Sequence, residues 1–182
     1  ISEDELNRLA TIQSVAEHRS LAIENSIFVP TSGIVRKGKH VFSKQPPTLA
    51  FLLAGPYWIM QRFGLTFAGN AALVAYLLTL IGATIPVALG AGLIYRLGRL
   101  FELPRPKRML LAFTVALGSG LLSYGVVINA QAPAAALLLG SAACIAHVAI
   151  SKRPGVTSGW LAVAGMAAML AAKIGHPSAC AN

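Results

Sequence analysis

Three ionisable side chains near the start of the chain have types and spacing suited to chemistry. Asp4 and Glu5 form an acidic pair, and Lys44 lies in the segment Phe42-Ser43-Lys44-Gln45-Pro46-Pro47. Carboxylates serve as general bases or cation ligands, and a lysine can pair with an anion. All three side chains precede a series of long apolar runs, so any chemistry they perform should occur beside a membrane.

Each of these residues also has a purely structural interpretation. Ser2 and Glu5 match the S-x-x-E capping box, which places Asp4 and Glu5 in the first turn of a helix. Carboxylates there interact favourably with the helix dipole whatever the function. Lys44 is equally compatible with a contact to lipid headgroups, and Pro46-Pro47 with an ordinary helix start. On the residues alone, both interpretations stay open.

Composition indicates an all-α integral membrane protein. Hydrophobic residues make up 55% of the chain and charged residues 12%, against roughly 25% charged in an average soluble domain. The net charge of +9 is carried by short basic clusters between apolar runs. Because no basic stripe is interleaved with aromatic residues, basic loops flanking membrane spans explain the charge better than nucleic-acid binding.

About four transmembrane helices are predicted, in a membrane region covering residues 67–182. The first run, Phe67 to Tyr95, would be ~43 Å long as a helix, more than the ~30 Å hydrocarbon core, so it must tilt or bend. Pro86 gives it a reason to bend. The other predicted spans are Met109 to Ile128, Ala132 to Ile150 and Val156 to Ile174.

Basic residues in the loops predict the orientation in the cytoplasmic (inner) membrane. Lys and Arg surround the first connection and mark the third, whereas the second, Asn129-Ala130-Gln131, has none. The positive-inside rule then places the first and third connections in the cytoplasm. The N-terminal region and the Asn129 turn should face the periplasm or exterior. Since an outward N-terminal region needs something to export it, we expect a preceding span and a longer parent chain.

Residues 1–66 are predicted to form an external loop with two interfacial helices. The first helix should run from about Glu3 to His18, with one apolar side lying along the membrane surface. The turn-rich stretch Thr31 to His40 is expected to hold a short strand or hairpin. Thr48 to Met60 is apolar but too short to span comfortably, which favours a second surface helix.

The order of these parts resembles the polytopic glycosyltransferases of family 39, the protein O-mannosyltransferase and aminoarabinose transferase-like enzymes. In that family, an Asp-Glu pair begins a surface helix in the first external loop. A Tyr/Phe-x-x-Lys-x-Pro-like segment then opens a second surface helix before the remaining spans. Here Asp4-Glu5 and Phe42-x-Lys44-x-Pro46 occur in the same order. The motifs are short, and the resemblance covers nearly all of this chain but only the first part of a complete enzyme.

The resemblance implies a polyprenyl-phosphate sugar donor and a role for each residue. Asp4 would be the catalytic base or the ligand of a divalent metal cation, with Glu5 as its catalytic neighbour. Lys44 would bind the donor phosphate. The family often has a second acidic residue at the outer end of a later span, where this chain has the amides Asn129 and Gln131. These two are candidate substrate-binding residues, and equally candidate turn residues, and their amides put the metal in doubt.

The resemblance predicts an enzyme that transfers a glycosyl group to a lipid, glycan or protein acceptor at the outer face of the membrane. The alternative is a non-catalytic multi-span protein such as a transporter subunit. A transporter is expected to place polar residues within its spans near the midplane. Here the predicted spans contain almost no ionisable groups, which favours chemistry at the membrane surface.

Overall fold

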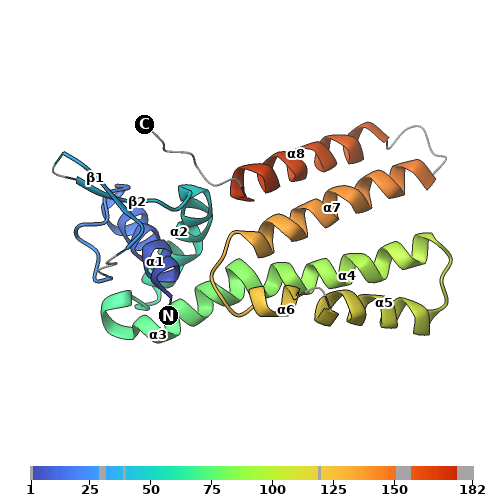
Figure 1. Ribbon diagram of the computed structural model, residues 1–182, viewed down its shortest axis with the longest axis horizontal. Helices are drawn as coiled ribbons and strands as arrows, with labels where there is room; N and C mark the ends of the chain where they lie inside the picture. Colours follow the sequence, from blue (N-terminus) through green and yellow to red (C-terminus); the bar gives the residue numbers. More distant parts are fainter. Residues whose placement is uncertain (1, 29–31, 39, 119, 151–156, 176–182) are drawn as a thin grey trace. The chain divides into compact units, whose positions relative to one another are not determined.

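The computed structural model is mostly helical and describes residues 2–28, 32–38, 40–118, 120–150 and 157–175 (Figure 1). Its contacts divide the chain into two compact units. The first consists mainly of Ile1–Gly82, and the second of Ala83–Gly175. The predicted boundary at residue 66 lies earlier, because the start of the long apolar helix belongs to the first unit.

The first unit begins with helix α1 (Glu3–Gln13), which continues as the π-helical turn η1 (Ser14–His18). This confirms the predicted helix and its capping box. However, its apolar residues Leu9, Ala10 and Ile12 are at most 1% exposed, and α1 packs against helix α2 (Pro47–Arg62). The face predicted to lie on the membrane is therefore covered by protein.

A two-stranded antiparallel hairpin follows, formed by β1 (Ile34–Lys37) and β2 (His40–Ser43). Its register pairs Ile34 with Ser43 and Lys37 with His40. Gly38, at its tip, has a φ of +65°, a conformation that glycine adopts without strain. The predicted hairpin is confirmed, with its second strand extending beyond the expected stretch to Ser43.

The long apolar run forms a helix over Phe67–Leu100 that is long and apolar enough to cross a membrane. It comprises α3 (Phe67–Thr79), the π-helical turn η2 (Leu80–Thr84) and α4 (Ile85–Leu100). Pro86 has no N–H and its ring clashes with the carbonyl four residues earlier, at Gly82. The regular hydrogen-bond ladder is interrupted at η2, as expected for a proline inside a long helix.

The predicted span from Met109 to Ile128 does not form as one helix. Helix α5 (Arg105–Gly118) ends at Gly118, and only the short α6 (Leu121–Tyr124) follows. Gly120 has a φ of +71°, which an α-helix cannot accommodate. The run is apolar, as the prediction required, but Gly118 and Gly120 end the helix inside it.

Two helices complete the second unit: α7 (Gln131–Ile150) and α8 (Thr157–Gly175). In the described part of the chain, α7 and Phe67–Leu100 are the two helices long and apolar enough to cross a membrane, and the apolar stretch of α8, Gly159–Ile174, is shorter. The structure thus confirms a mostly helical protein with two candidate spans, and it does not confirm the predicted number of about four.

The second unit packs through α4, which contacts both α5 and α7, and through α7, which also contacts α8 (Figure 1). Small residues allow this approach: a Cβ at Gly90 would lie 3.4 Å from Leu139, and one at Gly140 3.8 Å from Leu93. The rings of His147 and Trp160 lie 5.3 Å apart between α7 and α8.

Candidate functional site

The fold brings the acidic pair next to the lysine segment, forty residues away in sequence. Gln45, the residue after Lys44, donates from Nε2 to Oδ1 of Asp4 at 2.7 Å. Its Oε1 accepts a hydrogen bond from Nη2 of Arg8 at 3.1 Å. A single glutamine amide therefore connects two positions on α1 to the start of α2. We call Asp4, Arg8, Lys44 and Gln45 the α1–α2 cluster.

Lys44 is held through its backbone by a second set of contacts to α1. Fully buried Asn7 donates from Nδ2 to the carbonyl oxygen of Ser32 at 2.8 Å. The next carbonyl, of Gly33, accepts from the backbone N–H of Lys44 at 2.8 Å. The Lys44 side chain is exposed and makes no hydrogen bond or ion pair with any described residue. Its backbone is fixed while its ammonium is available.

Asp4 and Glu5 differ in what their carboxylates contact. Glu5 accepts from the backbone N–H of Ser2 at 2.8 Å, and Ser2 Oγ accepts from the Glu5 backbone N–H at 3.3 Å. Glu5 therefore completes the capping box, whatever else it does. Asp4 is exposed, and its Oδ1 is held by Gln45. Of the pair, Asp4 is better placed to act on another molecule.

Arg8 is a half-buried cation with incomplete hydrogen bonding. Burial lowers the pKa of its guanidinium, and the nearby charges of Asp4 and Glu5 oppose that effect. Its Nε and Nη1 are buried without a hydrogen-bond partner among the described residues. A buried donor without a partner is costly. The hydrogen bond from Arg8 Nη2 to Gln45 Oε1 offsets part of that cost and holds the guanidinium in the α1–α2 cluster.

A second polar network lies at the other end of α1. Carboxylate Oε1 of Glu17 accepts from the hydroxyl of Tyr57 and from Gln61 Nε2, and Oε2 accepts from Gln13 Nε2. The Tyr57 hydroxyl also accepts from the Phe67 backbone N–H at 3.3 Å. Burial of Tyr57, followed by its bond to Glu17, raises its pKa to about 12. This network joins η1, α2 and the start of α3.

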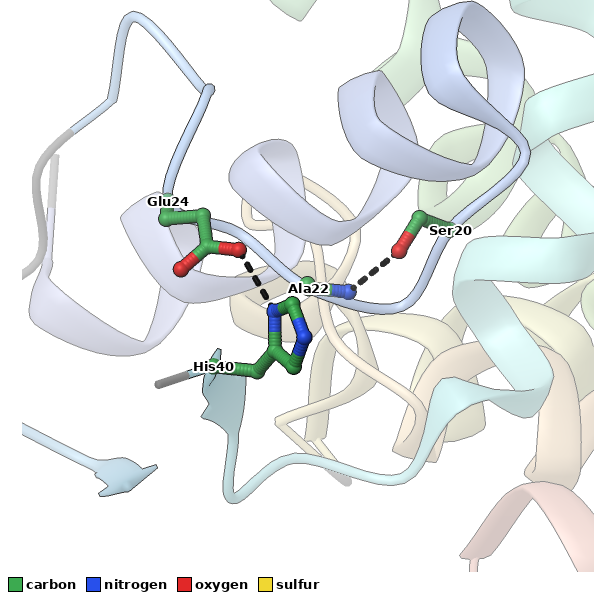
Figure 2. Close-up of polar contacts among 4 residues, drawn as sticks. All are labelled: Ser20, Ala22, Glu24 and His40. Carbon is green, nitrogen blue, oxygen red and sulfur yellow. Dashed lines mark hydrogen bonds and ion pairs between the residues drawn. The ribbon is translucent and has the colours of Figure 1, made fainter. Parts of the chain in front are cut away.

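A surface pair secures the hairpin to the chain that follows α1 (Figure 2). Nδ1 of His40 lies 2.7 Å from Oε1 of Glu24. Beside it, the Ala22 backbone N–H donates to Ser20 Oγ at 3.1 Å, and the Ile23 N–H donates to the Val41 carbonyl at 2.8 Å. The hairpin that leads to Lys44 is therefore held to this segment by the His40–Glu24 pair and by the backbone hydrogen bond from Ile23 to Val41.

Asp4 is the predicted ligand of a divalent cation. The described residues contain no group of three or more His, Cys, Asp or Glu side chains that could hold a metal ion. Asp4 contributes one carboxylate, with Oδ1 already accepting from Gln45, and Glu5 is engaged in the capping box. Since Ca²⁺ and Mg²⁺ require about six oxygen ligands, we assign no chemical step to a metal.

Asn129 and Gln131 belong to the second unit, and the structure gives Asn129 a helix-capping role. Its Oδ1 accepts from the backbone N–H groups of Gln131 and Ala132 at 3.0 and 2.9 Å. Its Nδ2 donates to the carbonyl of Tyr124 at 2.7 Å. The Asn129 side chain is thus occupied in starting α7, while Gln131 is exposed.

Sequence reasoning missed Asn7, Arg8 and Gln45. Arg8 had a detectable signal, because it follows Asp4 by four residues and so shares a helix face with it. Gln45 and Asn7 had none, since their partners lie far away in sequence.

No known protein family, curated protein or solved structure matches this chain.

Proposed function

We propose that the chain is part of a membrane enzyme that transfers a glycosyl group from a polyprenyl-phosphate sugar to an acceptor. The observation that carries the proposal is the Asp4–Gln45 hydrogen bond of 2.7 Å. It places an exposed carboxylate beside the segment that presents the exposed Lys44. Two helices long and apolar enough to cross a membrane support the location of such a donor.

In this proposal, the acceptor attacks the anomeric carbon of the donor sugar. The new bond joins the acceptor atom to that carbon, and the bond from the carbon to the phosphate oxygen breaks. Asp4 takes the proton released by the acceptor, as a general base. The Lys44 ammonium stabilises the negative charge on the departing polyprenyl phosphate. Glu5 keeps the first turn of α1 in place through the capping box.

The outer face of α2 supports a position at the membrane surface. One face of α2 packs inside the first unit, and the opposite face exposes large apolar side chains by about half or more: Phe51, Leu52, Trp58 and Ile59. Phe63, directly after the helix, is exposed as well. The guanidinium of Arg62 lies 4.7 Å from the centre of the Trp58 ring. Exposed apolar residues with Trp and Arg are typical of a helix lying at the headgroup level. We propose that α2 lies in the membrane plane, facing the exterior.

Replacing Lys44 tests the proposal. In the full-length enzyme, Lys44→Ala should lower transfer from a polyprenyl-phosphate sugar by about 100-fold or more, because the leaving-group charge loses its counter-ion. Lys44→Arg should restore it only partly, since a planar guanidinium does not reproduce a compact ammonium. The matched control is Arg36→Ala, which removes an exposed cation from the hairpin that leads to Lys44 and should retain activity. Near-normal transfer by Lys44→Ala would refute the assignment.

Replacing Asp4 separates the base from the phosphate contact. Asp4→Asn should lower turnover by about 10²- to 10⁴-fold through loss of proton transfer, while donor binding measured with labelled polyprenyl phosphate is retained. Loss of donor binding together with turnover would instead mean that Asp4 builds the donor site.

A further inference from the structure

A cluster of cations marks the end of the long apolar helix. The last turns of α4 carry Arg96 and Arg99, and the first turn of α5 carries Arg105, Lys107 and Arg108. We call these five side chains the basic corner. It begins where the candidate span Phe67–Leu100 ends. In a helix that crosses a bilayer, this is the level at which hydrocarbon gives way to headgroups.

Four members of the basic corner have no partner among the described residues. Arg96, Arg99, Arg105 and Lys107 are exposed and make no hydrogen bond or ion pair with a described side chain. The nearby acidic residue, Glu102, is exposed and forms no ion pair with any of the five. Like charges concentrated in this way repel one another, and no ion pair among the described residues offsets that repulsion.

The position of the α5 cations is also unfavourable for the helix itself. The first turn of a helix carries the positive end of the macrodipole, so basic residues there weaken it and acidic residues strengthen it. Helix α5 has Arg105, Lys107 and Arg108 in its first residues and no acidic residue there. Helix stability therefore does not explain these cations, but an anion bound at this end would benefit from both the side chains and the dipole.

Arg108 is fixed between the two helices. Its guanidinium lies 5.0 Å from the centre of the Tyr95 ring. A Cβ at Gly98 would lie only 2.8 Å from Cγ of Arg108, so the glycine makes room for the arginine stem. Nε of Arg108 is buried without a described hydrogen-bond partner. This contact sets the approach of α5 to α4 at the basic corner.

We propose that the basic corner binds the headgroups of anionic phospholipids. The partner is identified by charge complementarity and by position, because clustered Lys and Arg next to a membrane span attract anionic lipid. The remainder of α5 agrees with a membrane partner, since Met109, Leu110, Phe113 and Leu117 are each more than half exposed. The proposal does not rest on the glycosyl-transfer function.

The test uses the full chain in neutral detergent and a fluorescent phosphatidylglycerol, whose binding is followed by anisotropy. Each cation near a membrane surface contributes about 1 kcal/mol, equivalent to about fivefold in affinity. The variant Arg99→Gln/Lys107→Gln should therefore bind about 25-fold more weakly. The matched control, Arg19→Gln/Arg36→Gln, removes two exposed cations from the first unit and should bind as the parent does. Cooperative thermal unfolding without lipid, at a midpoint no lower than that of the parent, verifies that both variants fold.

Competition identifies the ligand. Unlabelled phosphatidylglycerol should displace the probe, while phosphatidylcholine and inorganic phosphate should not. Equal weakening by the test variant and the control would overturn the proposal, because it would reflect net charge alone. So would displacement by inorganic phosphate at the concentration at which phosphatidylglycerol displaces the probe, or stronger displacement by a single-stranded oligonucleotide than by lipid.

Discussion

Gly33 fixes the hairpin against α1 and gives the sharpest test at the scale of single residues. It has a φ of +68°, and a Cβ there would lie 2.8 Å from Nδ2 of buried Asn7. Gly33→Ala should therefore reduce the free energy of unfolding by more than the roughly 1–2 kcal/mol due to the left-handed backbone alone. Gly38→Ala is the matched control, because Gly38 has a φ of +65° with nothing within 4 Å.

Chemical denaturation of both variants in detergent measures the difference. The cost of Gly33→Ala beyond that of Gly38→Ala is the contribution of the Asn7 contact. Equal losses would mean that the Asn7 side chain moves aside freely and does not fix Ser32.

Tyr57 predicts a pH dependence. Its pKa is raised to about 12 from an ordinary value of 10 by burial and by its bond to Glu17. A folded pKa above the unfolded one means that the folded state holds its proton more tightly. This contribution to stability is complete below pH 10 and is lost as the pH rises through 12.

Unfolding midpoints measured from pH 9 to 12 should therefore fall more steeply for the parent than for Tyr57→Phe. Subtracting the Tyr57→Phe curve from the parent curve cancels the contributions of the other tyrosines and lysines, because both proteins contain them. Parallel curves would show that Tyr57 ionises as readily in the folded protein as in the unfolded chain.

The local part of the candidate site was predictable, and its long-range part was not. The capping box of Ser2 and Glu5 follows from four consecutive residues, and the structure contains it. The contact between Asp4 and Gln45 depends on how the hairpin folds back onto α1, which no local pattern encodes. Buried Asn7 and its bond to Ser32 determine that return.

At the scale of secondary-structure elements, Asn129 distinguishes helix capping from substrate binding. Asn129→Ala removes the acceptor for two N–H groups at the start of α7, and should reduce the free energy of unfolding by about 1 kcal/mol. Gln131→Ala, at an exposed position, should change it by less than about 0.5 kcal/mol. Thermal unfolding measures both, and transfer activity should be retained in both if the amides serve only the helix. Loss of activity in Gln131→Ala, without loss of stability, would restore it as a substrate-binding candidate.

Hydropathy predicted where apolar helices occur better than where they end. The long helix and α7 were correctly placed, because the prolines and glycines in their apolar runs, such as Pro86 and Gly140, bend or fit the helix without ending it. The run from Met109 to Ile128 is as apolar, yet α5 ends at Gly118. An average over a window does not register Gly118 and Gly120, whose backbone freedom ends the helix. Elements with internal glycines therefore need backbone arguments in addition to hydropathy.

At the scale of the whole molecule, orientation is the central prediction. We expect the hairpin to face the exterior and the α4–α5 connection to face the cytoplasm, because Lys and Arg gather at the latter. In a Cys144→Ser/Cys180→Ser background, the cysteine of Arg36→Cys should react with an impermeant thiol reagent in intact cells. The cysteine of Pro104→Cys should react only after lysis. Labelling of Pro104→Cys in intact cells would show the opposite orientation, with Lys44 on the wrong side for the proposed donor.

The close contact between Gly98 and Arg108 also limits how this protein can change over evolutionary time. A methyl group at position 98 would fall 2.8 Å from Cγ of Arg108. A side chain at position 98 therefore excludes the present conformation of Arg108. Among homologous sequences, we expect residues 98 and 108 to vary together: glycine with a long side chain, or alanine with a shorter one. Such paired substitutions would identify the α4–α5 packing from sequences alone, without any structure.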